Sequence, residues 1–193
     1  MRRARWVGSR LLLEERRRLR QERMRLWVAR ERAVAVWMHG ASAIPSVVLL
    51  LVAVSWIGDG VVWYALVGAL PFIGGAVGKT VALYMLALGA VNLVFYKALK
   101  QRIARPRPYV SCPDIKACAR SLDEFSFPSG HTMHAVAFSM LLSHFYPSFE
   151  PALWSFTALV AISRVVLGLH YPSDVLIGAA IAVVTAKFFL VVV

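Results

Sequence analysis

Residues 175–193 read VLIGAAIAVVTAKFFLVVV and contain a single charged side chain, Lys187. A helix needs about 20 mostly apolar residues to cross the hydrocarbon core of a bilayer, so this stretch predicts a membrane-spanning helix. Other apolar blocks precede it, and 59% of the 193 residues are hydrophobic. Soluble domains are roughly half apolar, so the composition argues against an ordinary soluble domain and favours an all-α, polytopic membrane bundle.

Short polar or Gly/Pro-containing interruptions divide the apolar sequence into blocks that predict about six transmembrane helices. The expected spans are Ala33–Ile57, Val61–Val77, Val81–Leu99, His131–Tyr146, Ala152–Leu169 and Val175–Val193. The expected turns between the first three spans are Asp59-Gly60 and Gly78-Lys79. Residues 34–193 are therefore interpreted as one membrane domain.

Residues 1–33 have a different character, because 12 arginines and four glutamates give them +8 of the formal net charge of +12. No helix breaker follows Gly8, which predicts a basic helix in the cytoplasm or at the membrane interface. Leucines at 12, 19 and 26 also fit a coiled coil, which so many like charges disfavour. This flank marks the cytoplasmic side under the positive-inside rule and suits anionic lipid head groups rather than nucleic acid.

The segment 101–129 is the only long internal loop expected, and it contains four prolines and both cysteines, Cys112 and Cys118. A local disulfide is possible if the loop lies outside the cytoplasm, and two free thiols are the alternative. A metal site is not expected, because two sulfurs at this spacing lack two obvious further ligands.

Three polar segments stand at boundaries of the expected spans. They are KQRIARPRP at 100–108, PSGH at 128–131 and SRVVLGLHYPSD at 163–174. With the N-terminus inside, six spans would put all three segments on the outer face. A phosphate ester undergoing transfer spreads negative charge over its oxygens, which fixed cations stabilise. Lys100, Arg107 and Arg164 are the candidate cations for such a site.

The same segments contain groups suited to moving a phosphoryl group. Ser129 and Gly130 lie where a helix N-terminus would favour an anion. His131, just inside that helix, is placed to protonate a departing alkoxide. Asp174, four residues after His170, can fix the imidazole tautomer and leave the other nitrogen free to attack phosphorus.

The other three histidines are weaker candidates for catalysis. His134 lies one turn beyond His131 and is a weaker candidate for lining the pocket. His39 and His144 fit ordinary bundle or interface positions. Taken singly, the charged residues of the three segments also fit head-group contacts or helix caps; their joint occurrence favours catalysis.

The order and spacing of the three segments resemble the type 2 phosphatidic acid phosphatase superfamily over roughly residues 34–193. The resemblance implies that His170 is the nucleophile, Asp174 its partner and His131 the general acid. It further implies phosphate ligands at Lys100, Arg107, Ser129, Gly130 and Arg164, and no metal or cofactor.

The function expected from these features is hydrolysis of a lipid phosphate mono- or diphosphate ester through a phosphohistidine. The candidate substrates are phosphatidate, phosphatidylglycerol phosphate and a polyprenyl diphosphate such as undecaprenyl diphosphate. The alternatives are a lipid phosphotransferase and a non-catalytic protein that binds lipid phosphate. The expected location is the bacterial inner membrane, with the N-terminus cytoplasmic and the active site at the periplasmic face.

Overall fold

The structure is a computed structural model that describes residues 2–121 and 123–192. Its helices are α1 (Arg2–His39), α2 (Pro45–Trp56), α3 (Val62–Ile73), α4 (Gly75–Ile103), α5 (Pro108–Ser111), α6 (Gly130–Phe145), α7 (Glu150–Val166) and α8 (Pro172–Val192). Short 3₁₀ segments lie at Gly40–Ala43 and Pro147–Phe149, and a π-helical segment lies at Ile57–Val61. Within the described residues the only β pairing is an isolated bridge between Pro106 and Phe125, which confirms the all-α class.

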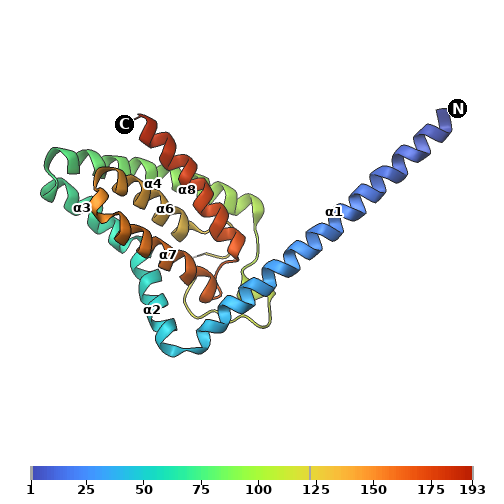
Figure 1. The fold of residues 1–193 in the computed structure, drawn as a ribbon, viewed down its shortest axis with the longest axis horizontal. Coiled ribbons are helices and arrows are strands. Elements are labelled where there is room, and N and C mark those ends of the chain that lie inside the picture. The colour runs from blue at the N-terminus through green and yellow to red at the C-terminus, as the bar shows by residue number, and fades with distance from the viewer. Residues whose placement is uncertain (1, 122, 193) are drawn as a thin grey trace.

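Among the residues that the structure describes, four helical segments are long and apolar enough to cross a bilayer. They are Pro45–Ile73, Gly75–Ile103, Pro147–Val166 and Pro172–Val191. α6, with 16 residues, is shorter and lies among them with a largely buried surface. A helical membrane bundle is therefore confirmed, whereas the predicted number of six spans is not (Figure 1).

The first two predicted spans form one bent helical segment instead of two separate spans. Residues 33–39 still belong to α1, and α2 begins at Pro45, where the fixed φ of proline suits the first helical turn. Asp59 and Gly60 have non-helical backbone angles, as a turn would require, but the chain resumes a helix in the same segment at Val62. The predicted turn at 59–60 is therefore a kink inside a membrane-spanning segment.

The boundary between the next two elements also differs from the prediction. The chain turns at Gly74 and Gly75, and Gly75 has a positive φ of 57°, which glycine adopts without a Cβ penalty. Lys79 lies inside α4, one turn after this reversal. The last three predicted spans agree with α6, α7 and α8 to within three residues at each end.

α1 ends against the end of the bundle that holds the long loop, and its N-terminal part extends away from the bundle (Figure 1). Arg32 Nε donates to Cys112 Sγ at 3.0 Å, and His39 Nδ1 lies 2.8 Å from the carbonyl oxygen of Val166. Residues 31–39 and the loop after α4 therefore lie at the same end. The prediction that a membrane crossing at Ala33–Ile57 separates the basic segment from the active-site face is wrong.

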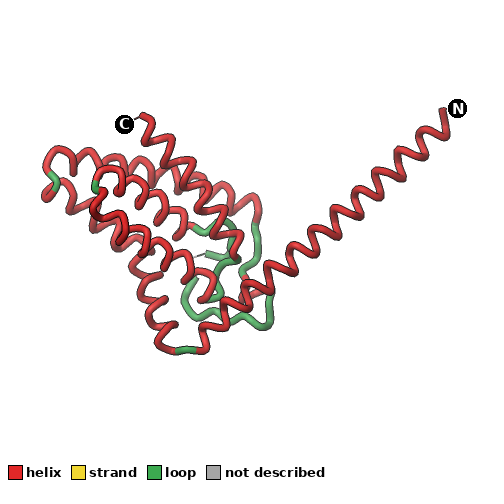
Figure 2. The backbone as a smooth tube through the Cα atoms, in the orientation of Figure 1, coloured by secondary structure: helices red, strands yellow, loops and turns green. Residues whose placement is uncertain are grey.

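The core of the bundle is formed by buried side chains of α2, α3, α4, α6, α7 and α8. Met85, Leu88, Met133 and Leu141 are completely buried there. The long connection between α4 and α6 lies at one end of this bundle, beside the short turn between α7 and α8 (Figure 2). The helices thus bring the three polar segments predicted from the sequence to a common end.

Candidate active site

The ends of four helices position the predicted site residues. Lys100 is in the last turn of α4, Gly130 is the first residue of α6, Arg164 is in the last turn of α7 and Asp174 is in the first turn of α8. One backbone hydrogen bond joins the second and third polar segments: Ser129 N–H donates to the Asp174 carbonyl at 3.0 Å. Within the third segment, His170 N–H donates to the Arg164 carbonyl at 3.0 Å.

His170 lies in the turn between α7 and α8 and is buried, with 2% of its surface exposed. Arg107 Nη1 lies 3.3 Å from His170 Nε2. Because a guanidinium only donates, Nε2 accepts this bond and the proton of the neutral ring resides on Nδ1. Nε2 is therefore unprotonated and has a free electron pair, as a nucleophile requires. It also lies beside Arg107, a cation that would bind the phosphate group under attack.

Burial, followed by the positive charges of Arg164, Arg107 and Lys100, lowers the pKa of His170 well below its ordinary value of 6.5. The neutral imidazole is the form that can attack phosphorus. The same cations that would bind a phosphate thus also keep the His170 ring unprotonated.

Asp174 faces the other ring nitrogen, but at a longer distance than predicted. Its Oδ2 is 3.8 Å from His170 Nδ1, beyond hydrogen-bond length, and Nδ1 has no hydrogen-bond partner among the described residues. Oδ2 instead accepts the backbone N–H of Tyr171 at 2.8 Å, and Oδ1 accepts from Arg105 Nη1 at 2.7 Å. The predicted pair is brought together without a direct hydrogen bond.

Lys100 and Arg107 converge on the carboxylate of Asp123. Lys100 Nζ and Arg107 Nη2 each lie 2.6 Å from Oδ1, and the hydroxyl of Tyr96 donates to Oδ2. Burial opposes ionisation of Asp123, but hydrogen bonds from Lys100 and Tyr96 and the nearby charges hold its pKa below the ordinary value. An anion therefore already lies between two of the predicted phosphate ligands.

Arg164 is 2% exposed, and its Nη1 donates to the hydroxyl of Ser55 on α2. Its Nε is buried and has no hydrogen-bond partner among the described residues. A buried guanidinium with an unused donor is costly unless an anion binds it. This favours the prediction that Arg164 is a phosphate ligand.

Ser129 and Gly130 form the entrance of α6. The Ser129 hydroxyl is buried and lies 3.0 Å from the hydroxyl of Thr132. A Cβ on Gly130 would lie 2.7 Å from the ring of Tyr96. Glycine is therefore required here for close packing against Tyr96, a reason that the sequence did not indicate.

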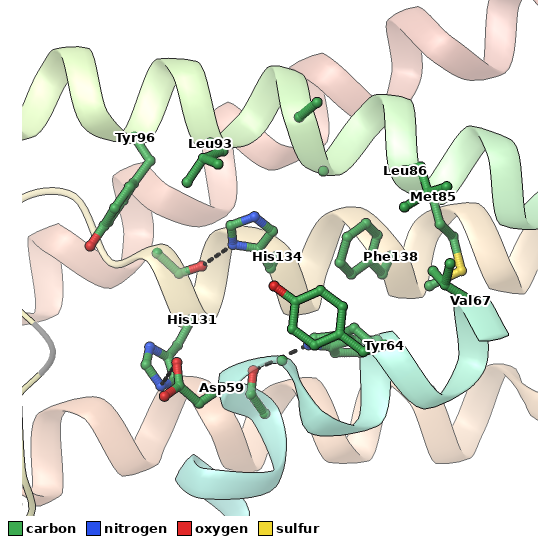
Figure 3. Close-up of a pocket in the computed structure, with 16 residues that line it drawn as sticks. Asp59, Tyr64, Val67, Met85, Leu86, Leu93, Tyr96, His131, His134 and Phe138 are labelled. Carbon is green, nitrogen blue, oxygen red and sulfur yellow. Dashed lines mark hydrogen bonds and ion pairs between the residues drawn. The ribbon is translucent and has the colours of Figure 1, made fainter.

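His131, in the first turn of α6, points toward the kink of the first membrane segment (Figure 3). Its Nε2 is 3.1 Å from Oδ1 of Asp59. Because a carboxylate only accepts, Nε2 is the ring nitrogen that carries a proton, as a group that protonates a leaving oxygen requires.

A cavity of about 460 Å³ reaches His131 from between α3, α4 and α6 (Figure 3). Apolar side chains line most of it, including Val67, Leu86 and Phe138. Tyr64, Leu86 and Leu93 line it and are also exposed on the outer surface of the bundle. The cavity is therefore an apolar groove at the lipid-facing side. His134 also lines it, while its Nδ1 lies 2.9 Å from the Gly130 carbonyl oxygen.

Four acidic or basic residues near the site were not predicted: Glu31, Asp59, Arg105 and Asp123. Each contacts a predicted site residue or a residue that binds one. Asp59 has a recognisable signal in the sequence, a carboxylate inside an apolar run, but the adjacent Gly60 makes the pair equally typical of a turn. Glu31, Arg105 and Asp123 lie among many other charged residues in the sequence. Their ion-pair partners can be identified only in the folded structure.

Cys112 and Cys118 are free thiols in the structure. Cys112 is buried, where its sulfur accepts from Arg32 and lies 3.4 Å from the hydroxyl of Tyr171. Of the two alternatives left open by the sequence, the structure thus has the unpaired one.

The chain is similar to known proteins in both sequence and fold. A sequence profile of the PAP2 superfamily matches residues 79–193. Decaprenylphosphoryl-5-phosphoribose phosphatase of Mycolicibacterium smegmatis is 38% identical over 96 residues, which cover 48% of this chain and 51% of that protein. Phosphatidylglycerophosphatase B of Bacillus subtilis is 33% identical over 120 residues, covering 56% and 55% of the two chains. The matched regions thus span about half the length of these relatives.

The fold is also similar to that of solved membrane proteins. The crystal structure of LpxE from Aquifex aeolicus superposes with a TM-score of 0.73 at 24% identity, covering 82% of this chain and 93% of that one. The profile match contains all eight predicted site residues, whereas Glu31 and Asp59 lie before it.

Proposed function

The chain belongs to the PAP2 superfamily, and on that basis we propose that it is a membrane phosphatase that hydrolyses a lipid phosphate ester through a phosphohistidine on His170. The observation that supports this most strongly is the position of His170 Nε2, which accepts from Arg107 beside two further buried cations. The relatives named above are phosphatases of lipid or polyprenyl phosphates.

In the proposed reaction the substrate phosphate replaces the Asp123 carboxylate between Lys100 and Arg107 and takes the unused donor of Arg164. His170 Nε2 attacks phosphorus, and the bond from phosphorus to the lipid oxygen breaks. His131 gives its proton to that oxygen, and Asp174 stabilises the positive charge on the His170 ring. Neutral His131 then takes a proton from water, whose oxygen attacks the phosphohistidine and releases inorganic phosphate.

The apolar groove between α3, α4 and α6 favours a lipid as the rest of the substrate. Its exposed rim would let an acyl or prenyl chain enter sideways from the bilayer, with the phosphate directed toward His131. Phosphatidate, phosphatidylglycerol phosphate and polyprenyl diphosphates all have this combination of a chain and a terminal phosphate.

We place the enzyme in a bacterial cell membrane with its active-site end facing the cytoplasm. Residues 31–39 of the basic helix lie at that end. Of the 22 basic residues, only Lys79, near the start of α4, and Lys187, near the end of α8, lie toward the opposite end. Under the positive-inside rule this distribution favours a cytoplasmic active site. This proposal replaces the periplasmic location expected from six spans.

The test is phosphate release from a panel of lipid monophosphates and polyprenyl diphosphates by purified protein in detergent with EDTA. We expect release from at least one lipid by the parent protein and by His144→Ala, an exposed histidine at the far end of α6, but none by His170→Ala. Transfer of labelled phosphate to an added acceptor lipid would indicate the phosphotransferase instead. Binding without turnover, unchanged in His170→Ala, would indicate a non-catalytic protein.

A further inference from the structure

Arg105 connects the partner of the candidate nucleophile to the N-terminal helix. Its Nη1 donates to Asp174 Oδ1 at 2.7 Å and to the Ser173 hydroxyl at 2.8 Å. Its Nη2 donates to Glu31 Oε2 at 2.7 Å. The guanidinium also lies over the ring of Tyr171, 4.0 Å from the centroid. One side chain thus touches α1, α8 and the turn that contains His170.

Asp174 depends on this contact. Its side chain is fully buried, and the charged or titratable groups that contact it among the described residues are Arg105 and His170. A buried carboxylate without a charged partner is strongly unfavourable. Arg105 therefore supplies the charged partner of the Asp174 carboxylate and, by binding Oδ1, leaves Oδ2 on the side of His170 Nδ1.

Glu31 binds both Arg105 and the first turn of α8. It lies on α1 and is buried, with 7% of its surface exposed, although 12 arginines surround it in the sequence of residues 1–33. Its Oε1 accepts the backbone N–H of Ser173 at 3.0 Å and also the Ser173 hydroxyl. A carboxylate from α1 thus satisfies a free N–H in the first turn of α8, the turn that contains Asp174.

We infer that Glu31 and Arg105 are positioning residues that hold Asp174 against His170, so that the N-terminal basic helix is part of the catalytic unit. This rests on the proposed function of His170 and Asp174 and adds a role for a helix that lies outside the superfamily match. Neither residue touches the proposed phosphate position; both act through Asp174.

The experiment compares kcat, KM and the pH profile of Glu31→Gln, Arg105→Gln and Arg105→Lys with the parent enzyme. Matched controls are Glu22→Gln, an exposed glutamate of α1, and Arg102→Gln, an exposed arginine in the last turn of α4. Hydrogen bonds to charged groups predict a fall in kcat of about 10- to 100-fold for Arg105→Gln, with a much smaller change in KM. The controls should stay within about 2-fold of the parent, as surface changes usually do.

Two readouts separate positioning from a general loss of structure. Without the Arg105 charge the Asp174 carboxylate is protonated more easily, so the acid limb of kcat should move to higher pH in Arg105→Gln and return in Arg105→Lys. In an Asp174→Asn background, Arg105→Gln should cause little further loss of kcat, because both changes act through the same carboxylate.

The outcomes separate this inference from the proposed function. If the parent releases no phosphate from any lipid, the proposed function fails, and the inference with it. If the parent is active but the Glu31 and Arg105 variants match their controls, the inference alone is wrong. It is also wrong if every variant loses its thermal unfolding transition, or if the Arg105 effect persists fully in the Asp174→Asn background, since the contacts would then be structural only.

Discussion

The carboxylate of Asp123 lies where two of the candidate phosphate ligands converge. Its contacts with Lys100, Arg107 and Tyr96 satisfy donors that would otherwise face each other in a buried, positively charged space. A substrate phosphate that binds Lys100 and Arg107 must displace this carboxylate. Asp123 is thus expected to stabilise the empty site and to compete with the substrate.

Replacing Asp123 by Asn should therefore strengthen binding of inorganic phosphate as a competitive inhibitor. A hydrogen-bonded charge pair contributes roughly 1.5–3 kcal/mol, which predicts a Ki that falls by about 10-fold or more. Asp114→Asn, at an exposed position of the same loop, is the matched control and should leave Ki unchanged. An unchanged or higher Ki in Asp123→Asn would show that the carboxylate does not compete for this space.

The lowered pKa of His170 has a direct spectroscopic consequence. Burial and the three nearby cations disfavour its protonated form, so the ring should remain neutral as the pH falls through 6.5. Nitrogen chemical shifts of ¹⁵N-histidine-labelled protein in detergent report this, and the signals missing in His170→Ala give the assignment. A midpoint at or above about 6.5 in the phosphate-free protein would contradict the described electrostatics.

The eight candidate site residues could be chosen from the sequence because each stands in a short segment with a recognisable spacing. Their charged neighbours could not. Asp123 and Arg105 contact residues far away in the chain, and Glu31 is 142 positions from Ser173, with no local pattern to pair them. The 3.8 Å separation of His170 Nδ1 from Asp174 Oδ2 could not be predicted either, because Oδ2 accepts the backbone N–H of Tyr171.

The start of α6 depends on one close contact between helices. Tyr96 of α4 packs against the backbone of Gly130, and its hydroxyl is held by Asp123, so the ring cannot move aside freely. The entrance of α6 and the cation cluster are therefore coupled through Tyr96.

Gly130→Ala should lower both stability and activity. The added Cβ would lie 2.7 Å from the Tyr96 ring, and overpacking of this kind costs about 1–3 kcal/mol. Gly40→Ala is the control, because a Cβ there meets nothing within 4 Å. Thermal unfolding and phosphate release measure the two effects. Equal behaviour of the two variants would contradict the described packing of α6.

The ends of the later helices could be predicted because proline and polar residues interrupt a uniformly apolar sequence there. The start of the first membrane segment could not be predicted, because no charged residue interrupts the apolar sequence there. The apolar residues of 33–39 continue into 45–57 without a charge, although Pro45 starts a new helix and the preceding residues belong to α1. Hydropathy alone does not distinguish an apolar helix end that packs on a loop from the start of a span.

The arrangement of the whole molecule predicts the side of the membrane on which the chain ends. From Pro45 onward, the bent first segment, α4, α6, α7 and α8 run alternately away from and toward the active-site end. Counting α6 together with the four longer segments gives five crossings, which would put the end of α8 opposite the basic helix α1, whereas six crossings would put both on the same side.

Reporter fusions after residue 193 test this in bacterial cells. With α1 in the cytoplasm, alkaline phosphatase at this position should be active and green fluorescent protein should not fluoresce. A fluorescent fusion with inactive alkaline phosphatase would contradict the proposed orientation, because residue 193 would then be cytoplasmic.

In the proposed reaction, phosphate is bound covalently to His170 between its release from the lipid and its transfer to water. The most direct measurement is to mix the protein with ³²P-labelled lipid phosphate, stop the reaction in alkaline denaturant within milliseconds to seconds, and locate the label by mass spectrometry. A phosphohistidine intermediate predicts a label on His170 that forms before free phosphate and is absent, together with phosphate release, in His170→Ala. Release that continues in His170→Ala, or a label on any other residue, would contradict it.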